Sequence, residues 1–245
     1  MIKNTFREWD LLIDLATEKN DLNYAKVITQ RPLSYYIKRI KNLGFTNKKC
    51  VLDVGCGYGQ WSVAMSAFNE KIISLEKSET RIEIAKEYIH SMNISNINLI
   101  YGDAEKMPFD DNSFDAIFCY GVFMFLKHDK ALNEFKRVLK NKGKIYICTN
   151  GGGWWLSLFI KNLFKNRKLA LIGLKSFLNF KGNNLPSSIS KKKAKRILKN
   201  NKNWQNIDID FEGELNNIDN LKSNYKKQFL FFDNVIEFTC NYIIK

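Results

Sequence analysis

Three alternate glycines near residue 55 could bring backbone amides close to a bound ligand. Gly55, Gly57 and Gly59 follow the mostly apolar residues 51–54, and an amphipathic segment begins directly after them. A strand that runs through a glycine-rich turn into a helix lets the main chain approach a ligand at the carboxyl end of the strand. Gln60 stands where a dinucleotide site needs a third glycine for close packing of the helix, so the spacing disfavours a nicotinamide or flavin site.

Two acidic residues follow the next two apolar stretches along the chain. Glu76 comes directly after residues 72–75, and Asp103 comes shortly after residues 97–101. A carboxylate at the first position can accept hydrogen bonds from two vicinal ribose hydroxyls, and one at the second can accept from an adenine amino group. Either acid alone would fit a surface charge or a helix cap. Together with the glycines, at three successive strand ends, they predict a site for an adenine nucleoside.

The elements that must position these residues are indicated by hydrophobic periodicity. Short apolar runs alternate with amphipathic segments, which predicts βαβ units and a parallel sheet. We expect strands at residues 50–54, 72–75, 97–101, 114–120 and 144–149, and helices at 60–68, 81–92 and 130–139. Two more strands, at 204–211 and 235–244, are expected as an antiparallel hairpin at one sheet edge. Helical spacing over residues 5–43 predicts one helix before Pro32 and one after it.

Over residues 45–150 the sequence resembles the class I S-adenosylmethionine-dependent methyltransferases, particularly the small-molecule branch that includes ubiquinone and menaquinone methylases. The resemblance lies in the motif 51–59, in Glu76, in Gly102-Asp103-Ala104 and in residues 134–140 ahead of Gly143. It implies a Rossmann-like α/β fold with a seven-stranded, mostly parallel sheet whose last strand is antiparallel. It also implies N-terminal helices, a helical insertion after the fifth strand, and S-adenosyl-L-methionine as the cofactor.

The same resemblance implies roles for individual residues. Asp53 and the three glycines would hold the methionine portion of the cofactor, Glu76 the ribose, and Asp103 with Ala104 the adenine. Tyr120 would face the cofactor after the fourth strand. The implied cofactor-binding set is Asp53, Gly55, Gly57, Gly59, Glu76, Lys77, Asp103, Ala104 and Tyr120.

The stretch after the fourth predicted strand departs from the family pattern. Many relatives place a pair of histidines there, whereas residues 122–126 of this chain are apolar. A general base is needed only if the acceptor is a hydroxyl. The sequence leaves that base open among His128, Tyr120, Asp10 and Tyr24, with Glu8, Tyr35 and Tyr36 as further candidates from the N-terminal helices. Each of them also fits an ordinary structural role.

The positive charge is concentrated in one segment. The chain has 39 Lys and Arg against 25 Asp and Glu, and residues 151–200 alone hold 12 basic and no acidic side chains. This segment is also rich in apolar residues, which predicts helices at 154–166 and 169–180. Three interpretations stay open: lid helices with lysines in solvent, a membrane-docking surface over 154–180 of a lipid or quinone methyltransferase, and a pocket for an anionic acceptor. The chain also has 28 Asn residues, and high Asn together with high Lys is typical of AT-rich coding sequences, so part of the lysine excess can reflect this bias.

Together these observations predict a single methyltransferase domain spanning residues 1–245. Its parts would be N-terminal lid helices (1–44), a cofactor-binding core (45–150), the basic and apolar helical insertion (151–200) and the C-terminal strands (201–245). We expect methyl transfer to a small-molecule or glycan-linked acceptor, with O-methylation favoured and surface polysaccharide or sugar-nucleotide metabolism as the setting. The alternative from another class is a non-catalytic binding module with a degenerate methyltransferase fold.

The remaining composition excludes several classes of protein. The five cysteines show no metal-ligand spacing, so they predict reduced thiols in the cytoplasm and no metal site. No uncharged run is long enough to span a bilayer, although peripheral membrane contact stays open. A nucleic-acid partner is not expected, because the signatures of the common RNA-binding modules are missing.

Overall fold

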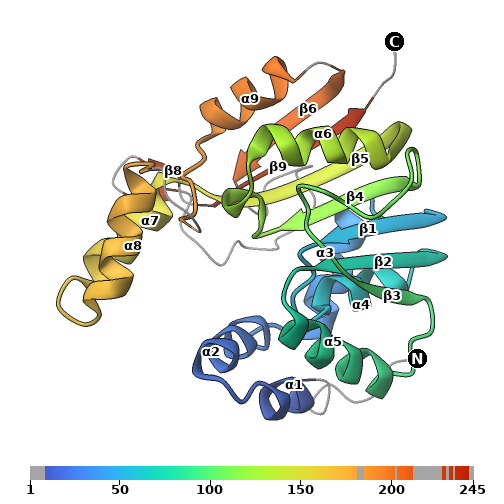
Figure 1. The fold of residues 1–245 in the computed structure, drawn as a ribbon, viewed down its shortest axis with the longest axis horizontal. Helices are drawn as coiled ribbons and strands as arrows, with labels where there is room; N and C mark the ends of the chain where they lie inside the picture. Colours follow the sequence, from blue (N-terminus) through green and yellow to red (C-terminus); the bar gives the residue numbers. More distant parts are fainter. Residues whose placement is uncertain are drawn as a thin grey trace. The chain divides into compact units, whose positions relative to one another are not determined.

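The computed structural model describes residues 9–180, 185–201, 203–211, 228–229, 232–233 and 235–242. Seven of the strands in this part of the chain form one sheet in the order β3-β2-β1-β4-β5-β9-β6 (Figure 1). They are β1 (Cys50–Val54), β2 (Lys71–Glu76), β3 (Ile97–Tyr101), β4 (Phe114–Tyr120), β5 (Leu139–Asn150), β6 (Trp204–Phe211) and β9 (Val235–Tyr242). β1 to β3 are parallel, and β9 runs antiparallel to both β5 and β6. The expected Rossmann-like fold with an antiparallel last strand is confirmed.

The chain divides into two compact units. The first comprises Met1–Asp103 and Phe114–Ala116, and the second comprises Ala104–Ser113 and Ile117–Lys245. Besides β1 to β3, the first unit contains the helices α1 (Asp10–Leu15), α2 (Lys19–Ile28), α3 (Leu33–Asn42), α4 (Gln60–Ser66) and α5 (Glu79–Ser91). Besides β5, β6 and β9, the second contains η1 (Phe123–Phe125), α6 (His128–Val138), α7 (Gly152–Asn162), α8 (Arg167–Phe177), α9 (Lys191–Asn200), β7 (Gln228–Phe229) and β8 (Phe232–Asp233).

In the first unit, the central strands are buried along almost their whole length. Every residue of β1 and β2 after the first is buried, which explains why both strands are mostly apolar in sequence. An aromatic cluster connects the N-terminal helices to α4 and α5. Trp9 stacks on Tyr88 with ring centroids 5.8 Å apart, and Tyr36 meets Trp61 edge to face at 4.7 Å. Such pairs contribute roughly 0.5–1.5 kcal/mol each beyond their buried area.

The N-terminal region contains one more helix than the sequence predicted. The expected helix before Pro32 is divided into α1 and α2. On α2, the buried residues among those whose side chains are described are Asp21, Ala25 and Ile28, one of them charged. These buried residues have the spacing of a helix but little apolar area. The hydrophobic periodicity was therefore too weak to predict α2 as a helix separate from α1.

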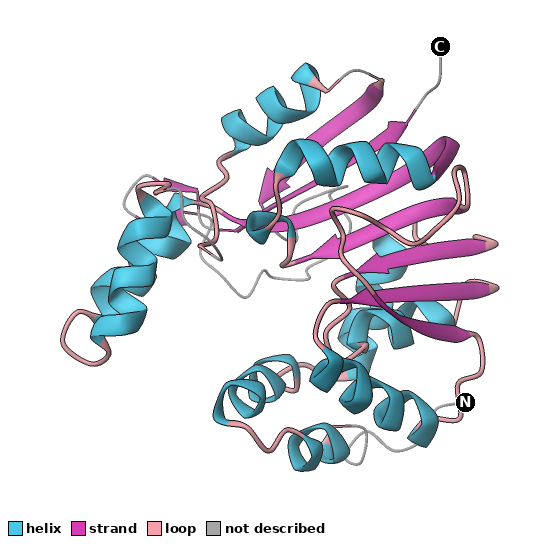
Figure 2. Ribbon diagram, viewed as in Figure 1, coloured by secondary structure: helices cyan, strands magenta, loops and turns pink. Residues whose placement is uncertain are grey.

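In the second unit, α7 and α8 form an antiparallel pair that we call the helical hairpin, residues 152–180. It leaves the carboxyl end of β5, lies beside β7 and β8 at its α7 end, and extends away from β5, β6 and β9 (Figure 2). The two helices approach closely at Gly173, where an added Cβ would lie 2.7 Å from the Phe159 amide nitrogen and 2.8 Å from the Trp155 carbonyl oxygen. The two helices of the hairpin therefore pack closely on each other, and the insertion after β5 is helical, as the sequence predicted.

Several boundaries in the second unit differ from the prediction. α6 begins at His128, and β5 begins at Leu139 rather than at residue 144. The start of β5 bends tightly, since a Cβ at Gly143 would lie 2.8 Å from the Lys140 carbonyl oxygen. α9 was not predicted, because its many basic residues were interpreted only as a charged stretch. The N-cap of this helix is Ser190, whose side chain accepts a hydrogen bond from the Lys193 amide. None of the helices in the described ranges is both long enough and apolar enough to cross a bilayer.

Candidate functional site

The glycine turn, residues 55–59, connects β1 to α4 in the first unit. Its three glycines have φ values of 68°, 59° and 81°, in the left-handed region that favours glycine. The Gly55 amide donates a hydrogen bond of 2.7 Å to the Leu75 carbonyl, which holds the turn against the end of β2. The turn is thus fixed by its neighbouring strand.

Glu76 joins the glycine turn to the end of β2. Its carboxylate is buried and accepts three backbone hydrogen bonds. Oε2 accepts from the Gly57 amide at 3.0 Å, and Oε1 accepts from the amides of Lys77 and Ser78 at 2.9 and 3.0 Å. Because each carboxylate oxygen has two lone pairs, Oε2 keeps the capacity to accept a hydrogen bond from a ligand hydroxyl.

Asp53 lies at the end of a buried chain of hydroxyls. Ser74 Oγ donates to Ser62 Oγ at 2.8 Å, and Ser62 Oγ donates to Asp53 Oδ2 at 2.6 Å. Burial raises the pKa of Asp53 to about 7, with the Ser62 hydrogen bond opposing and the Glu76 charge adding to the rise. A positive charge placed here would stabilise the ionised carboxylate.

The end of β3 is connected to the end of β2. The Gly102 amide donates to the Glu76 carbonyl at 3.0 Å, and Lys77 Nζ forms an ion pair of 2.6 Å with Asp103 Oδ2. The Lys77 side chain is exposed and that of Asp103 is partly exposed. Ion pairs of this kind contribute little to stability, so Asp103 can exchange partners at low cost.

Tyr24 of α2 lies against the glycine turn. A Cβ built on Gly57 would be 2.7 Å from Tyr24 Oη, and Gln60 Nε2 donates to the same oxygen at 3.3 Å. Arg81 lies over the Tyr24 ring, with its guanidinium carbon 5.1 Å from the centroid. Burial raises the pKa of Tyr24, so the phenol stays protonated at neutral pH and is unsuited to act as a base.

Cys56 is the residue of the glycine turn with a chemically reactive side chain. Its buried thiol points to the Gly57 carbonyl oxygen, 3.9 Å from Sγ. Burial and the charges of Asp53 and Glu76 raise the pKa of this thiol well above its ordinary value. At physiological pH the side chain is a neutral thiol.

Ala104 belongs to a loop that Arg137 anchors within the second unit. The Arg137 guanidinium donates to the carbonyl oxygens of Phe109 and Met107 at 2.6 and 3.0 Å, and it forms an ion pair of 2.8 Å with Glu134. Tyr120, the last residue of β4, is partly exposed. The cofactor contacts expected of Ala104 and Tyr120 stay predictions.

The remaining base candidates have very different surroundings. Asp10 is exposed at the start of α1, and Tyr35 is partly exposed with Arg31 over its ring. The Tyr36 hydroxyl is buried and donates to the Ile28 carbonyl at 2.6 Å, and burial raises its pKa. Burial and the Lys193 charge lower the pKa of His128 to about 4, so this imidazole is neutral at pH 7. Glu8 lies outside the described residues.

The structure thus brings most of the expected cofactor residues together in the first unit. Asp53, the glycine turn, Glu76, Lys77 and Asp103 are connected by the contacts above. Three polar residues around them were missed by the sequence reasoning, namely Ser62, Ser74 and the buried Gln60 side chain as a contact of Tyr24. Ser74 could have been found in the sequence as the one hydroxyl residue within the predicted strand 72–75. Within the described ranges, no group of three or more His, Cys, Asp or Glu residues could hold a metal ion.

The strand order and the glycine turn agree with the Rossmann-like methyltransferase fold that the sequence predicted. Residues 52–147 match the family model described as a methyltransferase domain. The chain is 36% identical over 116 residues to a demethylmenaquinone methyltransferase of Staphylococcus aureus (strain MRSA252), a match that covers 45% of this chain and 47% of that relative. The chain therefore aligns with about half the length of the curated relatives it matches.

Solved structures show the same fold at lower identity. A SAM-dependent methyltransferase from Aquifex aeolicus has a TM-score of 0.58 at 19% identity, covering 85% of this chain and 89% of that one. A SAM-dependent methyltransferase from Thermotoga maritima has a TM-score of 0.61 at 19% identity, covering 96% of this chain and 99% of that one. The matched methyltransferase domain model and these two SAM-dependent neighbours imply S-adenosyl-L-methionine as the cofactor.

The residues of the first unit fit this cofactor, which carries a sulfonium, an ammonium and a ribose diol. Gln60 Oε1 is buried beside the glycine turn and has no hydrogen-bond partner in the described part of the chain. This unsatisfied acceptor and the Asp53 carboxylate both favour a cationic group. Glu76 keeps acceptor capacity for a diol. The donor and acceptor chemistry of the site agrees with the implied cofactor.

Proposed function

We propose that this protein transfers the methyl group of S-adenosyl-L-methionine to a small-molecule acceptor. The observation that carries the proposal is the buried Glu76 carboxylate, held by the Gly57 amide beside an acidic and acceptor-rich turn. When bound, the cofactor supplies a methyl group that its sulfonium makes electrophilic. The protein then has to hold the nucleoside and amino-acid portions, align the acceptor and exclude water.

Within this proposal we favour an oxygen atom as the acceptor, in a small molecule or a glycan-linked compound. A hydroxyl needs a base. His128 is neutral at pH 7, but a pKa of about 4 makes it a weak base, and the phenols of Tyr24 and Tyr36 stay protonated, so the base stays unassigned among these residues. Surface polysaccharide or sugar-nucleotide metabolism would supply such hydroxyls. The five free cysteines support a reducing compartment such as the cytoplasm.

Calorimetry with S-adenosylhomocysteine tests the cofactor half of this proposal. We expect the unmodified protein to bind it, and we expect Asp103→Asn to bind roughly tenfold to a hundredfold more weakly, because a charge-assisted hydrogen bond contributes about 1.5–3 kcal/mol. Glu87→Gln removes the same charge from an exposed position on α5 and serves as the matched control. If the unmodified protein fails to bind, a non-catalytic module with a degenerate methyltransferase fold becomes the better interpretation.

A second candidate function is methyl transfer to a lipid quinone at a membrane surface. The name of the relatives indicates a quinone acceptor, and the helical hairpin has the composition of a membrane-binding element. Six of the nine large apolar residues exposed in the described part of the chain lie on it: Ile160, Leu163, Phe164, Leu171, Leu178 and Phe180. Residues 151–180 also carry five basic and no acidic side chains, which suits an anionic lipid surface.

Co-sedimentation with vesicles tests this candidate. We expect the protein to bind vesicles that contain phosphatidylglycerol and to bind pure phosphatidylcholine vesicles more weakly. Phe164, with 94% of its surface exposed, should insert furthest, so Phe164→Ser should weaken binding roughly tenfold. Val27→Ser, at an exposed apolar position on α2, is the control. Equal binding to both vesicle types, or equal binding by the Phe164 variant, would contradict membrane docking by the hairpin.

A further inference from the structure

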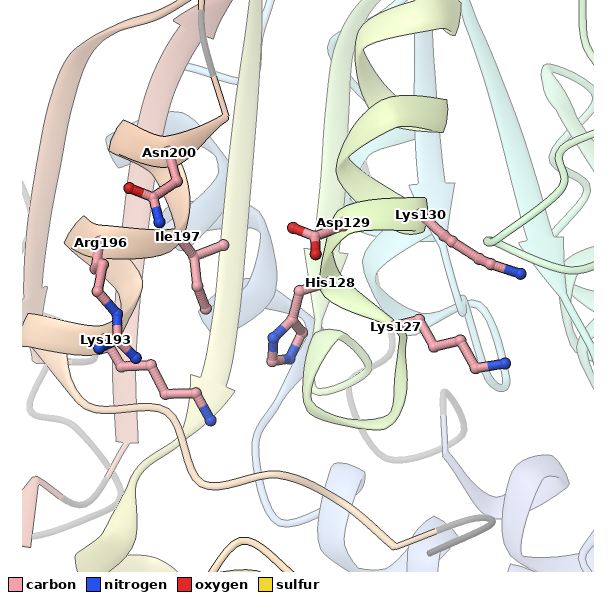
Figure 3. A pocket seen from close by; sticks show the side chains of 8 residues that line it. All are labelled: Lys127, His128, Asp129, Lys130, Lys193, Arg196, Ile197 and Asn200. Atoms are coloured by element: carbon pink, nitrogen blue, oxygen red, sulfur yellow. The ribbon is translucent and has the colours of Figure 1, made fainter. Parts of the chain in front are cut away.

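A cationic cleft lies between the start of α6 and the exposed side of α9, within the second unit. Its volume is about 790 Å³, in the range of small-molecule sites. Eight residues line it: Lys127, His128, Asp129, Lys130, Lys193, Arg196, Ile197 and Asn200. Figure 3 shows Lys193 and Arg196 on the α9 side and the His128 ring on the α6 side. The Lys127 and Lys130 side chains point away from α9.

The cleft has more positive than negative charge. Four of its residues are cationic and one, Asp129, is anionic. Among the residues that the structure describes, no carboxylate oxygen lies within 4.0 Å of the four cationic groups. Lys193 Nζ donates instead to two neutral oxygens, the Ser188 carbonyl at 2.8 Å and Asn179 Oδ1 at 3.2 Å. Burial and the Arg196 charge lower the pKa of Lys193, so the site would gain from an added anion.

The imidazole in the cleft is held in place by its neighbours. The His128 ring stacks on Phe123 with centroids 4.7 Å apart, and His128 Nε2 lies 3.1 Å from Ser187 Oγ. The Ser187 amide in turn donates to the Met124 carbonyl at 2.7 Å. A neutral ring held in this position can form a hydrogen bond with a polar ligand, and it adds no charge repulsion to that between Lys193 and Arg196.

We propose that this cleft binds the phosphate group of a hydroxylated small molecule, with Lys193 and Arg196 as the phosphate ligands. A phosphate monoester carries close to two negative charges and three acceptor oxygens, which match an ammonium and a guanidinium better than a single carboxylate does. Asp129 and His128 would accept hydrogen bonds from hydroxyls on the rest of the ligand. The volume suits a small molecule, and one carboxylate within the site disfavours a polyanion.

The imidazole resonances of His128 provide a local readout. The chain has 2 His residues, so a His128→Asn variant separates the signals of His128 from those of His90. At about pH 7.5, where phosphate esters are mostly dianionic, we expect glucose 1-phosphate to shift the His128 signals and leave those of His90 unchanged. Inorganic phosphate should produce a smaller shift, and glucose none.

Matched charge variants on α9 complete the test. Lys193→Gln and Arg196→Gln should each weaken binding of glucose 1-phosphate by roughly tenfold or more. Lys195→Gln removes the same charge from an exposed position of the same helix that does not line the cleft, and binding should persist. A response to phosphatidylglycerol vesicles in place of glucose 1-phosphate would assign the phosphate to a lipid headgroup.

Two results would overturn the proposal. One is a His128 signal that responds to none of these phosphates, and the other is equal weakening by Lys195→Gln, which would indicate a general effect of net charge. Arg196→Gln keeps the test valid if Lys193→Gln does not fold, because Arg196 is exposed and forms no ion pair with a described residue. S-adenosylhomocysteine binding is measured on the same samples. Loss of the phosphate proposal can therefore be distinguished from loss of the proposed function, because the two binding measurements are independent.

Discussion

Alanine in place of Gly57 is expected to abolish tight binding of S-adenosylhomocysteine and to destabilise the first unit. The backbone at this position has φ of 59°, which costs an L-residue roughly 1–2 kcal/mol. The new methyl would also lie 2.7 Å from Tyr24 Oη, and overpacking of this kind costs about 1–3 kcal/mol more. Chemical denaturation measures the loss of stability, and calorimetry on the folded variant measures the loss of binding.

Gly121 offers a matched control for the backbone cost. It has φ of 73°, and nothing lies within 4 Å of an added Cβ, so Gly121→Ala should cost about 1–2 kcal/mol and no more. In the Gly57→Ala protein, a second change of Tyr24→Phe removes the nearest atom but leaves Tyr24 Cε1 at 3.1 Å, so part of the lost stability should return. Equal destabilisation by the two single glycine variants would show that the Tyr24 contact has no effect.

Glu76→Ala should lower the free energy of unfolding more than Asp103→Asn does. Removing the carboxylate leaves the amides of Gly57, Lys77 and Ser78 without their acceptor, and a buried unsatisfied donor costs about 1–3 kcal/mol. We expect a loss of roughly 3 kcal/mol or more in unfolding free energy, with S-adenosylhomocysteine binding weakened roughly a hundredfold. Denaturant titration and calorimetry measure the two effects separately.

Asp103→Asn distinguishes binding from folding at this site. Its ion pair with Lys77 is solvent-accessible, so we expect its stability to change by less than about 1 kcal/mol while binding falls. Glu76→Gln keeps one acceptor oxygen and should lie between the alanine variant and the unmodified protein. If Glu76→Ala were as stable as Asp103→Asn, the three backbone hydrogen bonds would not be holding the turn.

The sheet and the glycine turn could be predicted because their signals are local. β1 and β2 are buried apolar runs, and the three alternate glycines between β1 and α4 indicate a turn whose backbone a ligand can approach. The hydroxyl chain from Ser74 through Ser62 to Asp53 could not be predicted, because it joins a strand and a helix that meet only in three dimensions. Even so, the acids at successive strand ends indicated at which edge of the sheet to expect the proposed site.

The cleft was missed for a different reason. Lys193 and Arg196 stood out in the sequence only as part of a basic stretch, and His128 only as an isolated histidine. They share a site because α9 begins at the Ser190 cap and turns these side chains toward the first turn of α6. Charge patterning shows how much positive charge a segment carries, but its direction depends on helix boundaries that a run of lysines obscures.

The protonated state of Cys56 has a consequence for the proposed methyl transfer, because the proposed cofactor is an alkylating agent. A thiolate in the glycine turn would be a strong nucleophile beside an activated methyl group, and the protein would be open to inactivating its own site. Burial and two neighbouring carboxylates keep this sulfur as a thiol, which is far less nucleophilic. Under the proposed function, the acidic residues that suit the cofactor would therefore also protect the protein from self-methylation.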